Sequence, residues 1–159
     1  MRRKIGLLAC VLLLLCSAAR ADSAIEWNGH TYKIFSGLVN WDIAKKRCEQ
    51  AGGYLVTINS KAEQDFIRIQ IMNHRGEAFW IGLEDTEKEG DWRWVTGEPL
   101  LFTNWGPNQP DNAGDGQDHA CIHTIPRDWN HSAAIIGQWD DDFDNEIHGY
   151  ICERNTIAR

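Results

Sequence analysis

Beyond an apolar run at its start, the chain first alternates apolar and polar residues and then repeats apolar residues at helical spacing. Residues 27–35 alternate in the manner of a half-buried strand. Side chains that suit one helix face recur at positions 41, 44, 45 and 48. We expect this first helix to end at Gly52-Gly53, because glycine is the usual residue just beyond a helix C-terminus.

A second helix is predicted to begin at Ser60. Glu63 follows three residues later and completes the Ser-x-x-Glu pattern of a capping box, in which both side chains satisfy free backbone N–H groups. The apolar face that we expect this helix to bury consists of Ala62, Phe66, Ile67, Ile69 and Ile71.

Shorter apolar segments separate the polar stretches of the second half of the chain. Residues 79–83, 92–95 and 149–153 are predicted strands, whereas residues 97–138 are predicted to be mostly loop. Two early helices followed by short strands indicate an α+β fold in one domain. A loop this long in a compact domain is expected to be functional or to be held by a bound group such as a metal ion.

The first 21 residues are predicted to be a secretory signal peptide. Arg2, Arg3 and Lys4 precede an apolar run at positions 5–15, and small residues lead to Ala21. This run is too short to cross a bilayer comfortably, so we expect no membrane span and a single domain over residues 22–159. A retained N-terminal anchor is the alternative interpretation.

The charge balance of the chain is acidic, with a formal net charge of −7. Loss of the four basic residues in the first 21 positions leaves 12 basic against 23 acidic residues. Such a chain is not expected to bind nucleic acid or an anionic membrane surface. Eight aspartates lie between Asp111 and Asp144, a concentration of like charge that a bound cation would neutralise.

The chain contains five cysteines, of which Cys10 and Cys16 lie in the predicted signal peptide. Cys48, Cys121 and Cys152 remain, and secretion favours a disulfide among them. An odd number leaves one thiol that is either unpaired or bridges to a second chain. Their spacing alone does not show which pair forms.

Residues 105–118 combine turn-forming residues with side-chain oxygens and include almost no apolar residue, so they are predicted to form a loop. Trp139-Asp140-Asp141 begin 21 residues after Asp118. Carboxylate and amide oxygens gathered in a loop are ligands for hard cations, and Ca²⁺ accepts them with relaxed geometry. Tryptophans at positions 92, 94, 105, 129 and 139 surround these residues. The combination predicts a calcium-dependent sugar-binding loop.

These motifs resemble the carbohydrate-recognition domain of C-type lectins. Three segments stand in the family's order and spacing: Trp80-Ile81-Gly82-Leu83, Gln109-Pro110-Asp111 and Trp139-Asp140-Asp141. The resemblance covers about residues 25–153. It implies an α+β C-type lectin-like domain with two helices, small antiparallel sheets and a long calcium-binding loop, and a disulfide between Cys48 and Cys152.

The resemblance also implies two sets of Ca²⁺ ligands. The principal set, which would bind the sugar as well, consists of Gln109, Asp111, Gln117, Asp140 and Asp141. An auxiliary set, typical of mannose-binding members, consists of Asp85, Glu89, Asn112 and Asp118. In the family the peptide bond before Pro110 is cis, which aims both flanking side chains at the metal.

Specificity is expected to follow the order of amide and acid in the principal set. Gln-Pro-Asp resembles galactose-type members, whereas Glu-Pro-Asn marks mannose types. Gln117 and Asp140 also exchange the usual acid and amide, so a second swap accompanies the first while the ligand charge stays at −3. We expect terminal galactose or N-acetylgalactosamine, with mannose or fucose as the alternative. Galactose-type members often carry a stacking tryptophan where Ala113 stands, and Trp129 is the candidate to replace it.

The chain departs from the family in three places beyond the calcium motif. His119 and Asp144 occupy the positions of the family's second disulfide. Cys121, two residues further on, is expected to be either an unpaired thiol or the bridge of a homodimer. Residues 126–138 form an insertion with the sequon Asn130-His131-Ser132, a glycosylation site if the source modifies its secreted proteins.

The expected activity is binding without catalysis, by a secreted extracellular lectin that recognises glycans on cells or microbes in innate immunity. The sequence offers no recognisable nucleophile–base pair, so we do not expect an enzyme. One alternative is a module of the same fold that binds a protein, because fold does not determine function. Another is a solvated acidic loop that binds nothing. The spacing of His119, His123 and His131 favours core or surface histidines over a shared zinc ion.

Overall fold

The computed structural model describes residues 24–125, 128–129, 132–133 and 136–156. The predicted signal peptide and the Asn130 sequon lie outside these residues. The helices are α1 (Trp41–Gln50) and α2 (Lys61–Ile71). The strands are β1 (Ile25–Trp27), β2 (His30–Val39), β3 (Tyr54–Leu55), β4 (Ala78–Glu84), β5 (Arg93–Trp94), β6 (His119–His123), β7 (Asp128–Trp129), β8 (Ser132–Ala133), β9 (Trp139–Asp142) and β10 (His148–Asn155).

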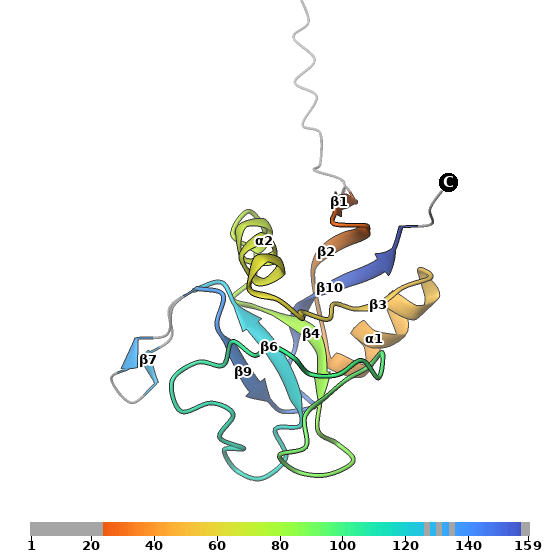
Figure 1. Ribbon diagram of the computed structural model, residues 1–159. Coiled ribbons are helices and arrows are strands. Elements are labelled where there is room, and N and C mark those ends of the chain that lie inside the picture. Colours follow the sequence, from red (N-terminus) through yellow and green to blue (C-terminus); the bar gives the residue numbers. More distant parts are fainter. Residues whose placement is uncertain (1–23, 126–127, 130–131, 134–135, 157–159) are drawn as a thin grey trace, which may run out of the picture.

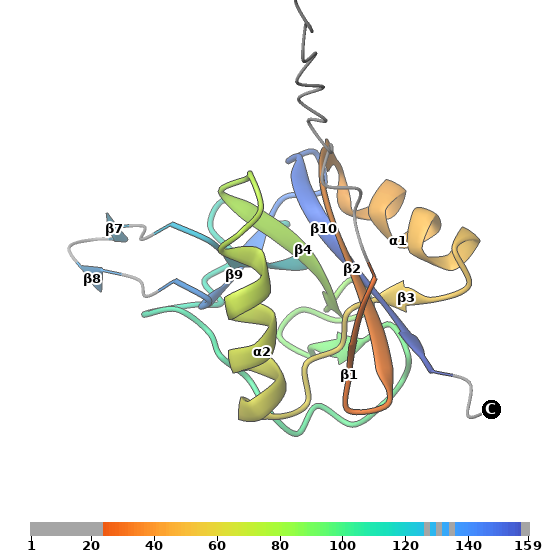
Figure 2. The same cartoon turned by 90° about the horizontal axis from the view of Figure 1, so that it is seen from above.

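The strands confirm the α+β class but form one mixed sheet where small antiparallel sheets were expected. The main sheet runs β1-β2-β10-β4-β6-β9, with β3 paired to β10 and β5 paired to β4. The last strand, β10, enters the middle of the sheet, antiparallel to β2 and parallel to β4 (Figure 1). This return brings the two ends of the domain together and makes the sheet mixed. Only the short β7–β8 hairpin stands apart from it among the described strands (Figure 2).

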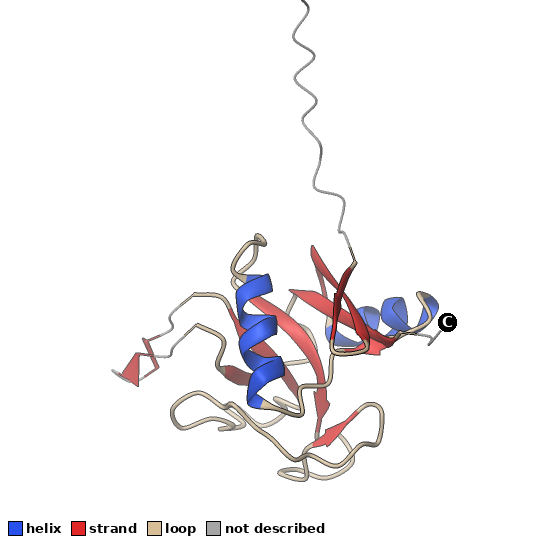
Figure 3. Ribbon diagram, turned by 45° about the horizontal axis from the view of Figure 1, so that its top comes forward, coloured by secondary structure: helices blue, strands red, loops and turns tan. Residues whose placement is uncertain are grey.

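The two helices lie on opposite sides of the sheet (Figure 3). Along β4, Phe79 and Ile81 join the core cluster that includes Ile67 of α2, whereas Trp80 joins the cluster that includes Trp41 of α1. Burial on both faces explains why β4 is a continuous apolar run. Position 82 of this strand requires glycine, because a Cβ at Gly82 would lie 2.5 Å from the carbonyl oxygen of Leu55.

The end of α1 and the start of α2 were predicted correctly, but the predicted buried face of α2 was wrong in part. Ser60 accepts a hydrogen bond from the Glu63 N–H at 3.2 Å, as a capping residue should. Ala62 and Ile69 are exposed, and the polar Glu63 and Gln64 are buried in their place. These two tolerate burial because they are hydrogen-bonded: Glu63 accepts from the Tyr32 hydroxyl, and Gln64 bonds at both ends of its amide.

The prediction of a loop over residues 97–138 was wrong for β6. This strand pairs with β4 on one side and β9 on the other, and all five of its residues are buried. The apolar pattern of the sequence did not indicate this strand, because the strand begins and ends with a histidine. They can be buried because His119 and His123 each lie beside a carboxylate.

The cysteines divide as the family resemblance implied. Cys48 of α1 and Cys152 of β10 form a disulfide, with their Cα atoms 5.2 Å apart. Cys121 is 0% exposed within the sheet. A homodimer bridge through Cys121 is therefore not supported, because a second chain cannot reach this sulfur in the folded domain. Within the described ranges no helix is long and apolar enough to cross a membrane.

Candidate metal and sugar site

The long polar loop between β5 and β6 lies at one end of the sheet, beside the loop that follows β4 (bottom of Figure 1). The Gln109-Pro110 peptide bond is cis, as the family resemblance implied. Trp105 makes an isolated parallel bridge with Trp139 at the start of β9, so the loop runs back along the sheet edge. This path brings the Gln-Pro-Asp and Trp-Asp-Asp motifs together.

Asp141 is the centre of this arrangement. Its side chain is fully buried and accepts hydrogen bonds from the backbone N–H groups of Asp111 (3.0 Å) and Asn112 (2.7 Å). The Gln117 side-chain amide donates to the Asp141 carbonyl at 2.9 Å. The structure thus brings Asp141 together with Asp111 and Gln117 of the loop, which lie 30 and 24 residues earlier in the sequence.

Two amide oxygens at this site have no donor. Gln109 Oε1 and Gln117 Oε1 are buried without a hydrogen-bond partner among the described residues. A buried acceptor left unpaired costs about 1–3 kcal/mol, so such oxygens normally have a partner. Both amides belong to the principal set expected from the sequence. Oxygen donors next to a buried carboxylate fit Ca²⁺, which takes six to eight oxygen ligands.

Asp140 is held differently from its neighbour. It pairs with Cys121 across the β6–β9 ladder, on the opposite face of β9 from Asp141. Its Oδ2 atom lies 3.2 Å from Nε2 of His123, which is fully buried. The sequence had placed His123 outside the site. Only the pairing of β6 with β9 reveals that it contacts a predicted ligand.

The four auxiliary residues form two contacting pairs. The backbone N–H of Asp85 donates to the Asp118 carbonyl at 3.1 Å, and the Asn112 amide donates to Glu89. Asp85 Oδ2 accepts from the Gly90 N–H at 2.7 Å, while its Oδ1 is buried without a partner among the described residues. Asn112 connects the two sets, because its side-chain oxygen accepts from the Gln117 N–H at 3.0 Å.

Burial sets the protonation behaviour of both clusters. It raises the pKa of the Asp141 carboxyl above its ordinary value, although hydrogen bonds from Asn112 and Asp111 act in the opposite direction. Burial likewise raises the pKa of Asp85, opposed by the Gly90 N–H and reinforced by the nearby charges of Glu89 and Asp118. Ionised carboxylates are therefore costly here unless a cation neutralises them.

Several of the tryptophans around the loop pack against one another in the core. Trp139 is fully buried, and its indole N–H donates to Gln64 of α2 at 2.8 Å. The rings of Trp94 and Trp105 meet the Trp139 ring edge-on, with centroids 5.7 and 5.8 Å away. Trp129, the expected stacking residue, lies in β7, where only the backbone is described. Its role in stacking stays a prediction.

His119 and Asp144 form a contact where the family resemblance led us to expect cysteines. His119 Nδ1 lies 2.7 Å from Asp144 Oδ1, and the His119 ring packs on Trp41 with centroids 4.0 Å apart. A polar pair therefore ties the segment after β9 to β6.

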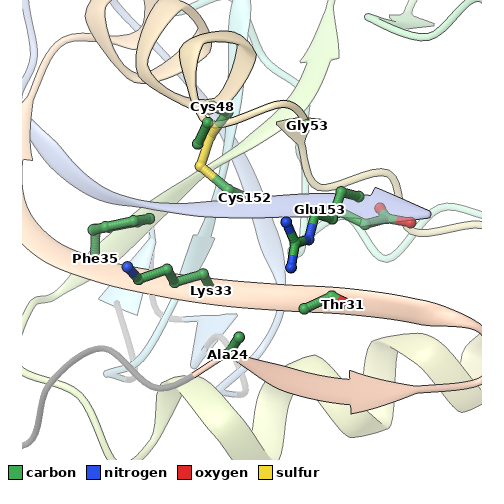
Figure 4. A pocket seen from close by; sticks show the side chains of 10 residues that line it. Ala24, Thr31, Lys33, Phe35, Cys48, Gly53, Cys152 and Glu153 are labelled. Atoms are coloured by element: carbon green, nitrogen blue, oxygen red, sulfur yellow. A yellow bond between two sulfur atoms is a disulfide. The ribbon is translucent and has the colours of Figure 1, made fainter. Parts of the chain in front are cut away.

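A separate hollow lies beside the disulfide, away from these loops (Figure 4). Its lining includes Phe35, Cys48, Cys152 and Glu153, and none of the predicted ligands. The hollow is therefore distinct from the candidate site.

The family model that matches this chain is the lectin C-type domain, over residues 38–154. The chain belongs to the C-type lectin family. This C-type lectin domain carries both halves of the candidate site, since the match spans the loop and β9. Members of the family are generally not enzymes.

Known relatives place the chain among carbohydrate-recognition domains. It is 32% identical to lectin BRA-3 of Megabalanus rosa over 159 residues, covering 97% of this chain and 91% of that lectin. It is 36% identical to the human versican core protein over 135 residues, 84% of this chain but only 4% of the length of versican. Versican is thus a relative of this domain alone.

A solved structure supports the same assignment. The carbohydrate-recognition domain of cow CD23, determined in the presence of a GlcNAc2Man3 oligosaccharide, has a TM-score of 0.72 and 31% sequence identity. The match covers 87% of this chain and 97% of the CD23 domain. The C-type lectin fold is therefore reproduced over nearly the whole described domain.

Proposed function

We propose that this chain is a secreted lectin that binds Ca²⁺ and, through it, terminal galactose or N-acetylgalactosamine. Gln109, Asp111, Gln117, Asp140 and Asp141 are the proposed ligands of the principal ion. The observation that carries the proposal is the pair of buried amide oxygens of Gln109 and Gln117, which have no hydrogen-bond partner among the described residues and belong to the loop whose backbone donates to the buried Asp141 carboxylate. We propose Asp85, Glu89, Asn112 and Asp118 as ligands of a second, auxiliary Ca²⁺.

The ligand side chains supply both kinds of hydrogen-bonding group that a sugar hydroxyl needs. A bound calcium ion supplies open coordination positions for two neighbouring sugar hydroxyls. The carboxylates of Asp111 and Asp140 can accept the hydroxyl protons, and the amide groups of Gln109 and Gln117 can donate to the hydroxyl oxygens. Asp141 has a further task, since its hydrogen bonds hold the backbone of residues 111 and 112 in place.

The galactose preference rests on the Gln-Pro-Asp order. Exchange of amide and acid moves the hydrogen-bond donors to the other side of the ion and changes which pair of hydroxyls fits. Gln117 and Asp140 repeat the exchange in the second half of the site. The proposal is that the first swap dominates, because Gln109 and Asp111 belong to the Gln-Pro-Asp triplet that resembles galactose-type members.

Secretion is proposed from residues 1–21, whose basic, apolar and small-residue order is that of a signal peptide. The Cys48–Cys152 disulfide agrees with an oxidising compartment. We propose that the mature domain covers residues 22–159 and recognises glycans on cells or microbes.

A glycan array on the mature protein, run with Ca²⁺ and again with EDTA, tests the proposal. Calcium-dependent binding to terminal galactose is the expected result. Calcium-dependent binding to mannose or fucose would retain the site and overturn the specificity. If the folded protein binds Ca²⁺ in calorimetry but no glycan on the array, the lectin proposal is wrong and a protein partner becomes the better hypothesis.

A further inference from the structure

A second group of metal-ligating side chains lies on the face of the sheet that α1 covers. Cys121 comes from β6, Asp142 from β9 and His148 from β10, and one ligand atom of each lies within 4.8 Å of the other two. The three residues are only 0%, 9% and 8% exposed. Three strands thus contribute one ligand each to a single buried point.

The chemistry of this group differs from that of the calcium loop. It offers a sulfur, an imidazole nitrogen and a carboxylate oxygen, whereas Ca²⁺ takes six to eight oxygens. Sulfur and imidazole favour Zn²⁺, which binds Cys, His and Asp in tetrahedral sites. A thiolate, a carboxylate and a neutral imidazole carry two negative charges together, which a divalent ion cancels. A buried site of this kind is then neutral overall, which removes the main cost of burying its charges.

The present distances are close to those of such a site. His148 Nε2 lies 2.8 Å from Asp142 Oδ2. Tetrahedral Zn²⁺ with its usual bond lengths separates two ligand atoms by about 3.4–3.6 Å, so this pair would open by roughly 0.6 Å. The other two separations are at most 4.8 Å. The Trp80 ring packs on the His148 ring with centroids 4.5 Å apart and limits how far the imidazole can turn.

A further donor lies next to the three. His123 Nε2 is 3.7 Å from Cys121 Sγ and could complete a fourth position in place of water. Residues 144–147, which link Asp142 to His148 through Phe143, are exposed.

We propose that Cys121, Asp142 and His148 form a Zn²⁺ site that is independent of the calcium loop. Its effect is structural: an ion bound there ties β9 and β10 to β6. Asp142 directly follows Asp141, so the zinc site would also fix the strand end that carries the sugar-site aspartates. This inference does not depend on the sugar specificity, since none of the three residues belongs to either proposed calcium set.

Titration of the metal-free mature protein with Co²⁺ tests the site, because cobalt reports a thiolate ligand by its charge-transfer absorption in the near ultraviolet. We expect one equivalent of Co²⁺ to produce this band, Zn²⁺ to abolish it, and a large excess of Ca²⁺ to leave it intact. Absence of the band in correctly folded wild-type protein would overturn the proposal.

Substitutions show which residues produce the cobalt absorption band. Cys121→Ser should lose the band, and His148→Gln should lower the affinity for Zn²⁺ by more than about 100-fold, since residues that only hydrogen-bond a metal ligand are already worth about 10–100-fold. His74→Gln, outside the cluster, is the matched control and should bind as the wild type does. If Cys121→Ser does not fold, His148→Gln decides the matter. Unchanged Zn²⁺ affinity in folded His148→Gln would contradict the assignment.

Discussion

Two groups of buried acids lie in this domain, and they are satisfied in opposite ways. Glu153 is 2% exposed and lies near the end of the last strand, β10. It accepts hydrogen bonds from the Thr57 N–H at 3.0 Å and the Tyr54 hydroxyl at 3.1 Å, and His30 Nδ1 lies 2.6 Å from it. The protein itself supplies every partner that this carboxylate needs.

Several side chains of the candidate calcium site lack such partners. Asp85 Oδ1, Gln109 Oε1 and Gln117 Oε1 are buried and have no hydrogen-bond donor among the described residues. Burial raises the pKa of Glu153 as it does that of Asp141, so the protonation behaviour does not separate the two groups. What separates the two groups is the presence of buried hydrogen-bond acceptors that have no donor. Buried acceptors without donors, and not buried carboxylates as such, indicate a place for a ligand.

The largest effect of a substitution is expected at the candidate calcium site. Asp141→Asn removes a charged ligand and should weaken Ca²⁺ binding by at least about 100-fold, because a change that acts only through a ligand's hydrogen-bond partner already costs about 10–100-fold. Isothermal titration calorimetry measures the affinity. Asp115→Asn is the matched control: it removes one exposed charge from the same loop, and asparagine tolerates the positive φ of +60° there. Equal Ca²⁺ affinities in both variants would contradict the site.

Substitution of Glu153 should change the stability of the protein and not its affinity for Ca²⁺. Glu153→Gln places an amide N–H₂ against donors, which should lower the free energy of unfolding by about 1–3 kcal/mol. Urea denaturation measures it, and the loss should be the same with Ca²⁺ and with EDTA. Glu146→Gln, at an exposed position, should leave stability unchanged. A loss seen only with Ca²⁺ would mean that the two groups are coupled.

The pH dependence of the calcium effect follows from the raised pKa values of Asp141 and Asp85. Without Ca²⁺, each carboxyl takes up a proton at a higher pH in the folded than in the unfolded protein. Its contribution to the free energy of unfolding therefore becomes more favourable as the pH falls through the raised value toward the ordinary value of 3.8. Calcium binds the ionised form, so protons compete with it over the same window.

We therefore expect the difference in Tm between Ca²⁺ and EDTA to shrink as the pH falls from about 7 to about 4. Differential scanning fluorimetry at several pH values measures this difference. A difference that stays constant over the range would show that carboxylates with raised pKa values are not the ligands.

The smallest change is expected from reversing the second swap. Gln117→Glu combined with Asp140→Asn keeps the ligand charge at −3, so Ca²⁺ affinity should change little. The relative inhibition by galactose and mannose should move by several-fold, because donors and acceptors exchange places around the ion. Competition on a galactose matrix measures it. An unchanged ratio would mean that Gln109 and Asp111 alone determine specificity.

Local signals predicted much of the framework. The N-terminal cap of α2, the stop of α1 and the run of β4 depend on residues a few positions apart, and the structure has each of them as expected. The candidate ligands of the loop could also be found from the sequence, because Gln109, Asp111 and Gln117 lie within one polar segment. The disulfide between Cys48 and Cys152 followed only from the family resemblance, since spacing left its pairing open.

By itself, then, the sequence determined the α+β class, the end of α1, the start of α2 and the residues that could offer oxygens to a cation. Only the tertiary structure decided which side chains meet across strands. The mixed sheet, the burial of β6, the Asp140–His123 contact and the group of Cys121, Asp142 and His148 all depend on strands that are distant in sequence. The periodicity of one segment shows which of its faces is buried, but it does not show which strand it pairs with.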